Sequence, residues 1–114
     1  VFGVIDGKVK PLYSIPLPAA HAPMRKNEIP SGLALSADGA KLFVCGNLSN
    51  RLLEVDTQTG KLTRSWDVGV APYDVVVSSG KAYVSNWGGR RPDETSLSGP
   101  AGQGTRVRVD PVRH

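Results

Sequence analysis

The side chains best suited to bind a ligand gather in two short stretches of the chain. The adjacent Arg90 and Arg91 suit carboxylate or phosphate oxygens, because each guanidinium group can donate two parallel hydrogen bonds. Trp87, in the same stretch, offers a flat surface on which a sugar or a base could stack. The candidate ligand-binding residues are Tyr73, Asp74, Asn86, Trp87, Arg90 and Arg91.

These residues also have ordinary structural interpretations. Arg90 and Arg91 could be a solvated pair in a loop, and Trp87 could cover an apolar core. Aspartates recur at turns that follow strands, where capping of backbone amides is the expected role; these are Asp6, Asp56 and Asp110. The sequence alone leaves both interpretations of the arginine pair and of the tryptophan open.

Other chemistries find little support. His21 and His114 are too far apart to have metal-ligand spacing. Gly88 and Gly89 are not followed by the Gly-Lys-Ser/Thr of a Walker-type phosphate loop. Cys45 alternates with apolar residues of an expected strand, so we expect a buried thiol with a structural role. The sequence therefore predicts no catalytic residue, no metal and no cofactor for this stretch of chain.

The composition is that of an ordinary globular domain. The 114 residues are 39% hydrophobic and 21% charged, with a formal net charge of +4. The positive surplus permits a small anionic ligand, whereas binding of nucleic acid has no specific support. No stretch approaches the roughly 20 apolar residues of a transmembrane helix, so no membrane span is expected. Because the chain begins with Val1 rather than Met, we interpret it as a fragment of a longer protein, and the compartment cannot be read from a leader.

The chain contains an internal repeat. Residues 30–36 resemble residues 72–78 in sequence, at an offset of 72 − 30 = 42. Residues 42–45 are echoed by residues 82–85, with Phe43 matched to Tyr83 at an offset of 83 − 43 = 40. A repeat of about 40–45 residues that is made of short strands is typical of a β-propeller.

The strand pattern agrees with the repeat. Four short segments are rich in aliphatic residues and separated by turn residues such as Asp38-Gly39: residues 33–36, 42–46, 51–56 and 62–68. No segment has a sustained helical period, so helix content should be near zero. The predicted fold is all-β: a partial β-propeller with one complete four-stranded antiparallel blade and two incomplete blades.

The blades can be placed along the chain. Residues 1–17 would end one blade with strands at 4–6 and 12–17, and residues 30–68 would form the complete blade. Residues 72–110 would form a partial blade with strands at 75–78, 82–86 and 106–110. A loop at 87–105 would interrupt it, and residues 92–105 are expected to be irregular because they are rich in Gly, Ser and Pro. The remaining blades of the same propeller are the expected structural partners.

One motif is more specific. Tyr83-Val84-Ser85-Asn86, after Ser79-Gly80-Lys81-Ala82, resembles the signature of the YVTN-type β-propeller repeat, and residues 43–47 are a looser copy. Residues 83–92 resemble a bacterial subfamily in which the propeller precedes an alkaline-phosphatase-like phosphoesterase domain. The resemblance implies a propeller fold and a periplasmic or extracellular location.

Blade geometry suggests where binding would occur. The two long connections, residues 18–31 and 87–105, should emerge on the same face of the propeller. The leading hypothesis is therefore a segment that scaffolds or binds a small anionic ligand or a protein partner on that face. The alternative is the substrate-entrance propeller of a phosphoesterase, or a lactonase-like catalytic propeller, whose catalytic residues lie outside this chain.

Overall fold

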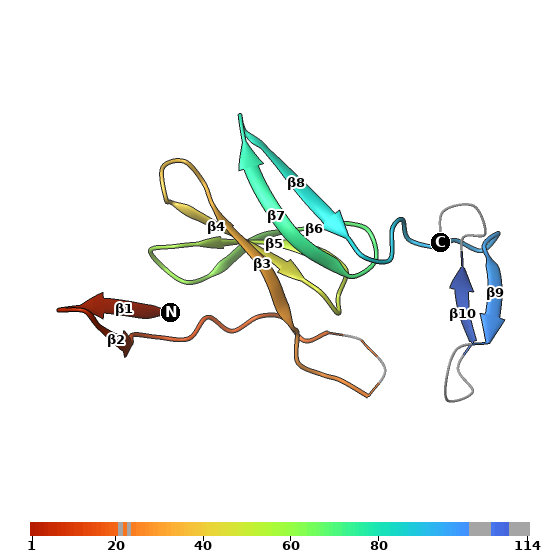
Figure 1. Cartoon of the computed structure of the whole chain (residues 1–114), viewed down its shortest axis with the longest axis horizontal. Coiled ribbons are helices and arrows are strands. Elements are labelled where there is room, and N and C mark those ends of the chain that lie inside the picture. Colours follow the sequence, from red (N-terminus) through yellow and green to blue (C-terminus); the bar gives the residue numbers. More distant parts are fainter. Residues whose placement is uncertain (21, 23, 101–105, 110–114) are drawn as a thin grey trace.

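The computed structural model describes residues 1–20, 22, 24–100 and 106–109. Within these ranges the chain forms strands, turns and loops, and no helix (Figure 1). The all-β prediction is therefore confirmed for the described residues. The strands are β1 (Phe2–Ile5), β2 (Lys8–Pro11), β3 (Pro30–Leu35), β4 (Lys41–Gly46), β5 (Arg51–Asp56), β6 (Leu62–Asp67), β7 (Pro72–Ser78), β8 (Lys81–Asn86), β9 (Leu97–Pro100) and β10 (Arg106–Val109).

The largest element is a four-stranded antiparallel sheet in the order β3-β4-β5-β6. Tight turns connect its first two and its last two strands, and each has a glycine in the left-handed region: Gly39 at φ 70° and Gly60 at φ 66°. Asp38 fixes the first turn by accepting hydrogen bonds from the Ser36 hydroxyl and the Ala40 amide. Local turn chemistry thus determines where these strands reverse.

The β7–β8 hairpin repeats the pairing of β3–β4. Leu33 pairs with Val44, and Val75 pairs with Val84, at offsets of 75 − 33 = 42 and 84 − 44 = 40. Both hairpins have a register shift near the proline that begins their first strand. One loop hydrogen bond is also repeated: the amide of Asn47 donates to the Ile29 carbonyl as that of Trp87 does to the Ala71 carbonyl. The sequence repeat therefore corresponds to a repeat of backbone pairing.

The core lies on both faces of the four-stranded sheet. On one face the buried Val44, Leu53 and Val55 pack with Leu42 and with residues of the segment that precedes β3, Ile15 and Leu17. On the other face the buried Cys45 and Leu52 pack against Val75 of the β7–β8 hairpin. A layer covers each face, which explains why the most buried side chains belong to β4 and β5.

The β7–β8 hairpin packs against the four-stranded sheet where the backbones of β3 and β7 approach closely. A Cβ on Gly32 would lie 2.4 Å from the Asp74 Cα, so only glycine fits there. Ser31 Oγ donates a 2.7 Å hydrogen bond to the Pro72 carbonyl across the same junction. The beginnings of β3 and β7 are therefore directly in contact.

Two strand predictions are wrong. The second strand near the beginning is β2 at Lys8–Pro11, not residues 12–17. The Asp6-Gly7 turn, with Gly7 at φ 69°, reverses the chain immediately before Lys8, and Pro16 has no amide to donate within 12–17. Residues 15 and 17 instead cover the core as part of an irregular segment.

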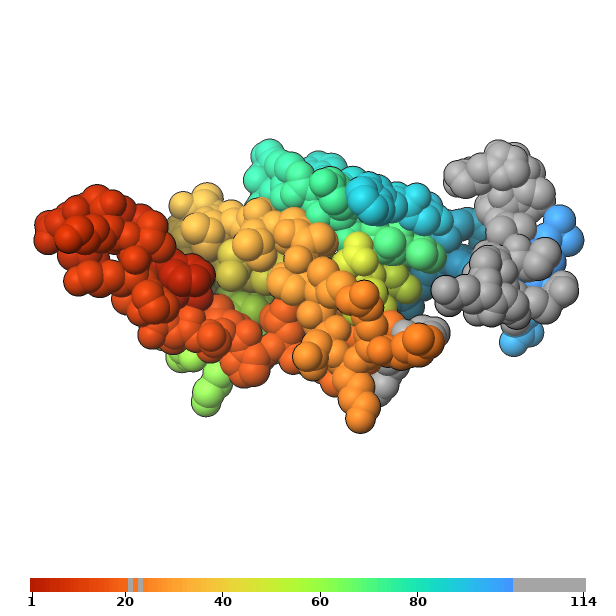
Figure 2. Space-filling model, turned by 60° about the horizontal axis from the view of Figure 1, so that its bottom comes forward, coloured from red at the N-terminus to blue at the C-terminus, as the bar shows by residue number. Residues whose placement is uncertain are grey.

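The second correction concerns residues 92–105. Part of this expected irregular loop is strand β9, which pairs with β10 in a separate hairpin, so β10 does not pair with β8. Backbone pairing with β10 makes β9 a strand, although its four residues include Gly99 and Pro100, which are poor strand formers. Figure 2 shows the resulting elongated molecule, with β1 and β2 at one end and β9 at the other; its extents are 53 × 33 × 25 Å. None of its described elements is a helix that is long and apolar enough to cross a membrane.

Candidate functional site

Both long connections meet the short turn between β4 and β5. The Glu28 carboxylate accepts hydrogen bonds from the amides of Leu48 and Ser49, at 2.9 and 3.2 Å. The Arg91 guanidinium donates to the Asn50 carbonyl at 2.5 Å. Residues from the connection before β3 and from the connection after β8 therefore lie at the same end of the sheet. His21, which the sequence places in the first of these connections, lies outside the described residues, as does His114.

The most prominent feature at this end is an exposed pair of aromatic rings. The centroids of Tyr73 and Trp87 are 4.7 Å apart, and their planes differ by 13°. Trp87 is 74% exposed and Tyr73 51% exposed, so this tryptophan does not cover a core. Backbone pairing holds the rings together, because the Trp87 amide bonds to the Ala71 carbonyl and the Gly88 amide to the Val70 carbonyl. The pair forms a flat aromatic surface open to solvent.

The side chains of Asp74 and Asn86 both bond to nearby backbone groups. The Asp74 Oδ1 accepts a 2.8 Å hydrogen bond from the amide of Val75, and its backbone abuts Gly32. The Asn86 side-chain amide donates to the Val84 carbonyl at 3.3 Å. Its Oδ1 is buried and has no hydrogen-bond partner in the described part of the chain. Asp74 is nevertheless solvent-exposed near the start of β7, whereas the Asn86 side chain is directed inward.

The two arginines already bind oxygens of the protein. Arg91 donates to the Val68 carbonyl at 2.9 Å, to the Asn50 carbonyl, and to the Asp67 carboxylate at 3.2 Å. Arg90 pairs with the Asp93 carboxylate at 3.2 Å. The Arg91 guanidinium therefore holds the segment after β8 against the β4–β5 turn and the end of β6, whereas Arg90 bonds within its own loop. Sequence reasoning missed this role because it cannot locate carbonyl groups.

The asparagines of the same turn are also engaged in structural bonds. The Asn50 side chain accepts from the amide of Ala71 at 2.8 Å, and the Asn47 side chain donates to the Pro72 carbonyl at 3.1 Å. Asn50 is left-handed, at φ 56°, a conformation that asparagine tolerates better than most residues. Both side chains fasten the start of β7 to the four-stranded sheet.

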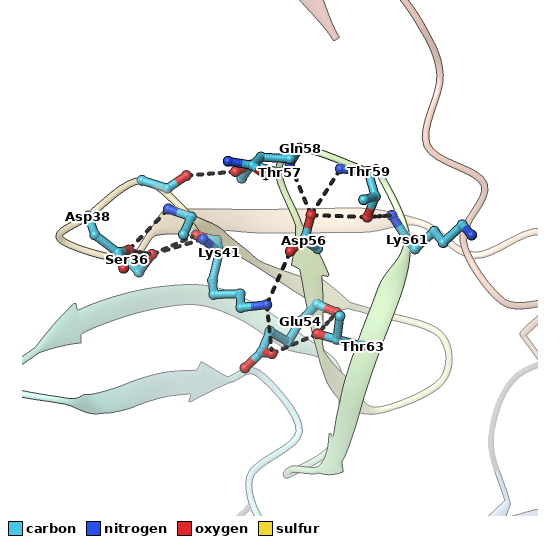
Figure 3. Close-up of polar contacts among 12 residues, drawn as sticks. Ser36, Asp38, Lys41, Glu54, Asp56, Thr57, Gln58, Thr59, Lys61 and Thr63 are labelled. Carbon is cyan, nitrogen blue, oxygen red and sulfur yellow. Dashed lines mark hydrogen bonds and ion pairs between the residues drawn. The ribbon is translucent and has the colours of Figure 1, made fainter.

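A second polar cluster lies at the opposite ends of β4 and β5 (Figure 3). Lys41 Nζ is 3.4 Å from the Asp56 carboxylate and 3.9 Å from that of Glu54, which also accepts a 2.6 Å hydrogen bond from the Thr63 hydroxyl. The amide and hydroxyl of Thr59 lower the pKa of Asp56. The expected capping role is confirmed for Asp56, while Asp110 lies outside the described residues.

Cys45 is buried, as its alternation predicts. Burial raises the pKa of its thiol, and the negative charge of Asp74 adds to this effect. A thiol whose ionised form is disfavoured is a poor nucleophile. The described residues contain no group of three or more His, Cys, Asp or Glu side chains that could hold a metal ion.

Sequence reasoning did not anticipate an open groove between the four-stranded sheet and the β7–β8 hairpin. Its volume is about 990 Å³. Side chains of β4–β6 form one wall and side chains of β7–β8 the other; they include Phe43, Leu52, Trp66, Ala82 and Val84. Such a groove leaves an apolar sheet face partly uncovered.

No family model matches the chain, and no curated protein matches it. The features of the chain that bear on its function are therefore the aromatic pair, the engaged arginines and the groove.

Proposed function

We propose that this chain is a segment of a YVTN-type β-propeller that binds a ligand or partner at the end where its long connections meet. The support for the propeller is the four-stranded antiparallel unit β3–β6 together with a second hairpin in the same register 40–42 residues later. The motif Tyr83-Val84-Ser85-Asn86 lies in β8, the strand that corresponds to β4 in the first unit.

The observation that carries the binding proposal is the exposed stack of Tyr73 and Trp87. Leaving two large rings in water is unfavourable, and aromatic surfaces of this kind bind flat ligands or partner side chains. Because the guanidinium groups of Arg90 and Arg91 already bond to protein oxygens, an anion gains less here than a neutral ligand does. The proposed ligand class is a ring with a flat apolar face and hydroxyl groups, such as a sugar, with Asp74 as a candidate acceptor.

The test uses Trp87 as its own reporter. In a Trp66→Phe background, Trp87 is the remaining tryptophan, and its fluorescence is titrated with an oligosaccharide, a phosphate monoester and a short single-stranded DNA. We expect a saturable change with the oligosaccharide. Tyr73→Ala should weaken binding at least about tenfold, which corresponds to about 1.4 kcal/mol.

The matched control is Tyr83→Ala. Tyr83 is 58% exposed on the same hairpin but does not belong to the stacked pair. Equal loss of binding in the Tyr73 and Tyr83 variants, or no saturable signal with any of the three probes, would contradict the proposal.

A further inference from the structure

Among the described residues, the outer edge of β8 has no strand partner, whereas that of β4 pairs with β5. In the first unit β4 pairs with β3 on one side and with β5 on the other. In the second unit β8 pairs with β7, and the described residues place no strand on its other edge. The β3–β4 and β7–β8 hairpins share one register. The space beside the outer edge of β8 therefore corresponds to the position of β5 in the first unit.

The groove lies beside this unpaired edge. Phe43 and Trp66 belong to the wall formed by the four-stranded sheet, with ring centroids 6.4 Å apart, and Trp66 is 40% exposed. Ala82 and Val84 of β8 face them from the other wall. A pair of strands added to β8 would cover these apolar side chains, as the β7–β8 hairpin covers Cys45 and Leu52.

The chain itself supplies such a pair. The β9–β10 hairpin is antiparallel and follows β8, as the antiparallel β5–β6 hairpin follows β4. Leu97 at the start of β9 is 60% exposed, so an apolar side chain is available for burial. The hairpin therefore has the order and pairing that the vacant position requires, and one exposed apolar side chain, Leu97, that docking would bury.

The connection is also long enough. Arg91 is bonded to the carbonyl of Val68, and Val68 lines the groove, so residue 91 is held at the mouth of the groove. Residues 92–96 then separate this anchor from β9. Five extended residues span up to about 16–18 Å, enough to bring Leu97 alongside the end of β8.

We propose that the groove and the free edge of β8 are the docking site of the β9–β10 hairpin of the same chain, with β9 paired to β8. The structure then represents an undocked state, and docking completes a second four-stranded unit. β9, rather than residues 106–110, is its third strand. The proposal does not depend on ligand binding at the aromatic pair, because the groove and the pair involve different residues.

Amide hydrogen exchange tests the proposal. The full chain is compared with a variant that ends at Ser96, and the readout is the exchange of β8 amides that point away from β7. Docking predicts exchange at least about tenfold slower in the full chain than in the truncated chain. The amides of β4 and β5 bond within the sheet in both proteins and serve as the internal control of folding.

If the truncated chain loses protection at β4 and β5, Gly99→Pro in the full chain replaces it, since proline removes an amide from β9. Equal β8 exchange in the full chain and in the variant that retains the fold would overturn the proposal. Protection of β8 that disappears on twentyfold dilution would also overturn it, because it would identify a second copy as the strand on that edge.

Discussion

The β3–β4 and β7–β8 hairpins share one register, yet their surroundings differ. The first is continued by β5 and β6 and has a packed layer on both faces, so Leu53 is 1% and Val55 0% exposed. In the second, no described strand pairs with the outer edge of β8, and Val76 and Tyr83 on the outer face are 59% and 58% exposed. The same local sequence pattern therefore determines strand pairing in both places, whereas burial depends on which strands and segments lie next to each hairpin.

The largest expected difference concerns core packing. Leu53→Ala should lower the free energy of unfolding by about 3 kcal/mol, because it opens a cavity in the buried cluster. Leu33→Ala, at a position that is 59% exposed, should change it by less than about 0.5 kcal/mol. Urea denaturation measures both. Similar losses in the two variants would show that burial is not concentrated in β4 and β5.

The junction between the two hairpins gives the next effect. Gly32→Ala places a methyl group 2.4 Å from the Asp74 Cα, which must move the β7–β8 hairpin away from the sheet. We expect a loss of about 2 kcal/mol from this overpacking. Gly99→Ala is the matched control, since a Cβ there meets nothing within 4 Å. Urea denaturation in which Gly32→Ala is as mild as Gly99→Ala would refute the close contact.

A smaller effect separates the two adjacent arginines. Arg91→Ala removes bonds to three carbonyls and the Asp67 carboxylate, and should cost about 1 kcal/mol in partly exposed surroundings. Arg90→Ala breaks an exposed ion pair with Asp93 and should cost about 0.5 kcal/mol or less. Thermal unfolding compares them. The reverse order would mean that Arg91 does not anchor the segment after β8.

The smallest expected effect concerns the titration of the Asp93 carboxyl group. The Thr95 hydroxyl, then the Ser96 hydroxyl and the Thr95 amide, lower the pKa of Asp93 to about 2. Because the folded chain favours the ionised carboxylate, this local stabilisation is present above the ordinary value of 3.8 and is lost as the pH falls toward 2. Carbon NMR of the carboxyl should give a midpoint near 2 that rises in Thr95→Ala. A midpoint near 3.8 in the unchanged chain would contradict the ordered turn.

The sequence predicted the parts of the fold that depend on local pattern. Alternating apolar residues and turn signals such as Asp38-Gly39 placed β3 to β8 within a few residues. It did not predict β9, whose four residues have weak strand propensity and owe their conformation to pairing with β10. It also placed β2 too late, at 12–17, because the apolar residues there pack against a core that belongs to distant strands.

The candidate site residues were chosen by residue type, which does not reveal their contacts. Tyr73 and Trp87 are brought together as an exposed pair, whereas Arg91 and Asn50 bond to backbone oxygens and amides of neighbouring segments. Such partners are backbone groups whose positions follow from the fold, so residue types alone do not reveal them. The groove was missed for a related reason: its lining residues come from strands that are distant in the sequence, and only the packing of the β7–β8 hairpin on the sheet brings them together.

Cross-strand nuclear Overhauser effects in the full chain test most directly whether the β3–β4 and β7–β8 hairpins share one pairing register. With a shared register, we expect contacts that join Leu33 with Val44 in the first hairpin and Val75 with Val84 in the second. A β7–β8 pairing displaced by one residue, with Val75 opposite Tyr83, would turn alternate side chains to the other face. That result would contradict the repeat of backbone pairing between the two hairpins, which is the main support for the proposed propeller.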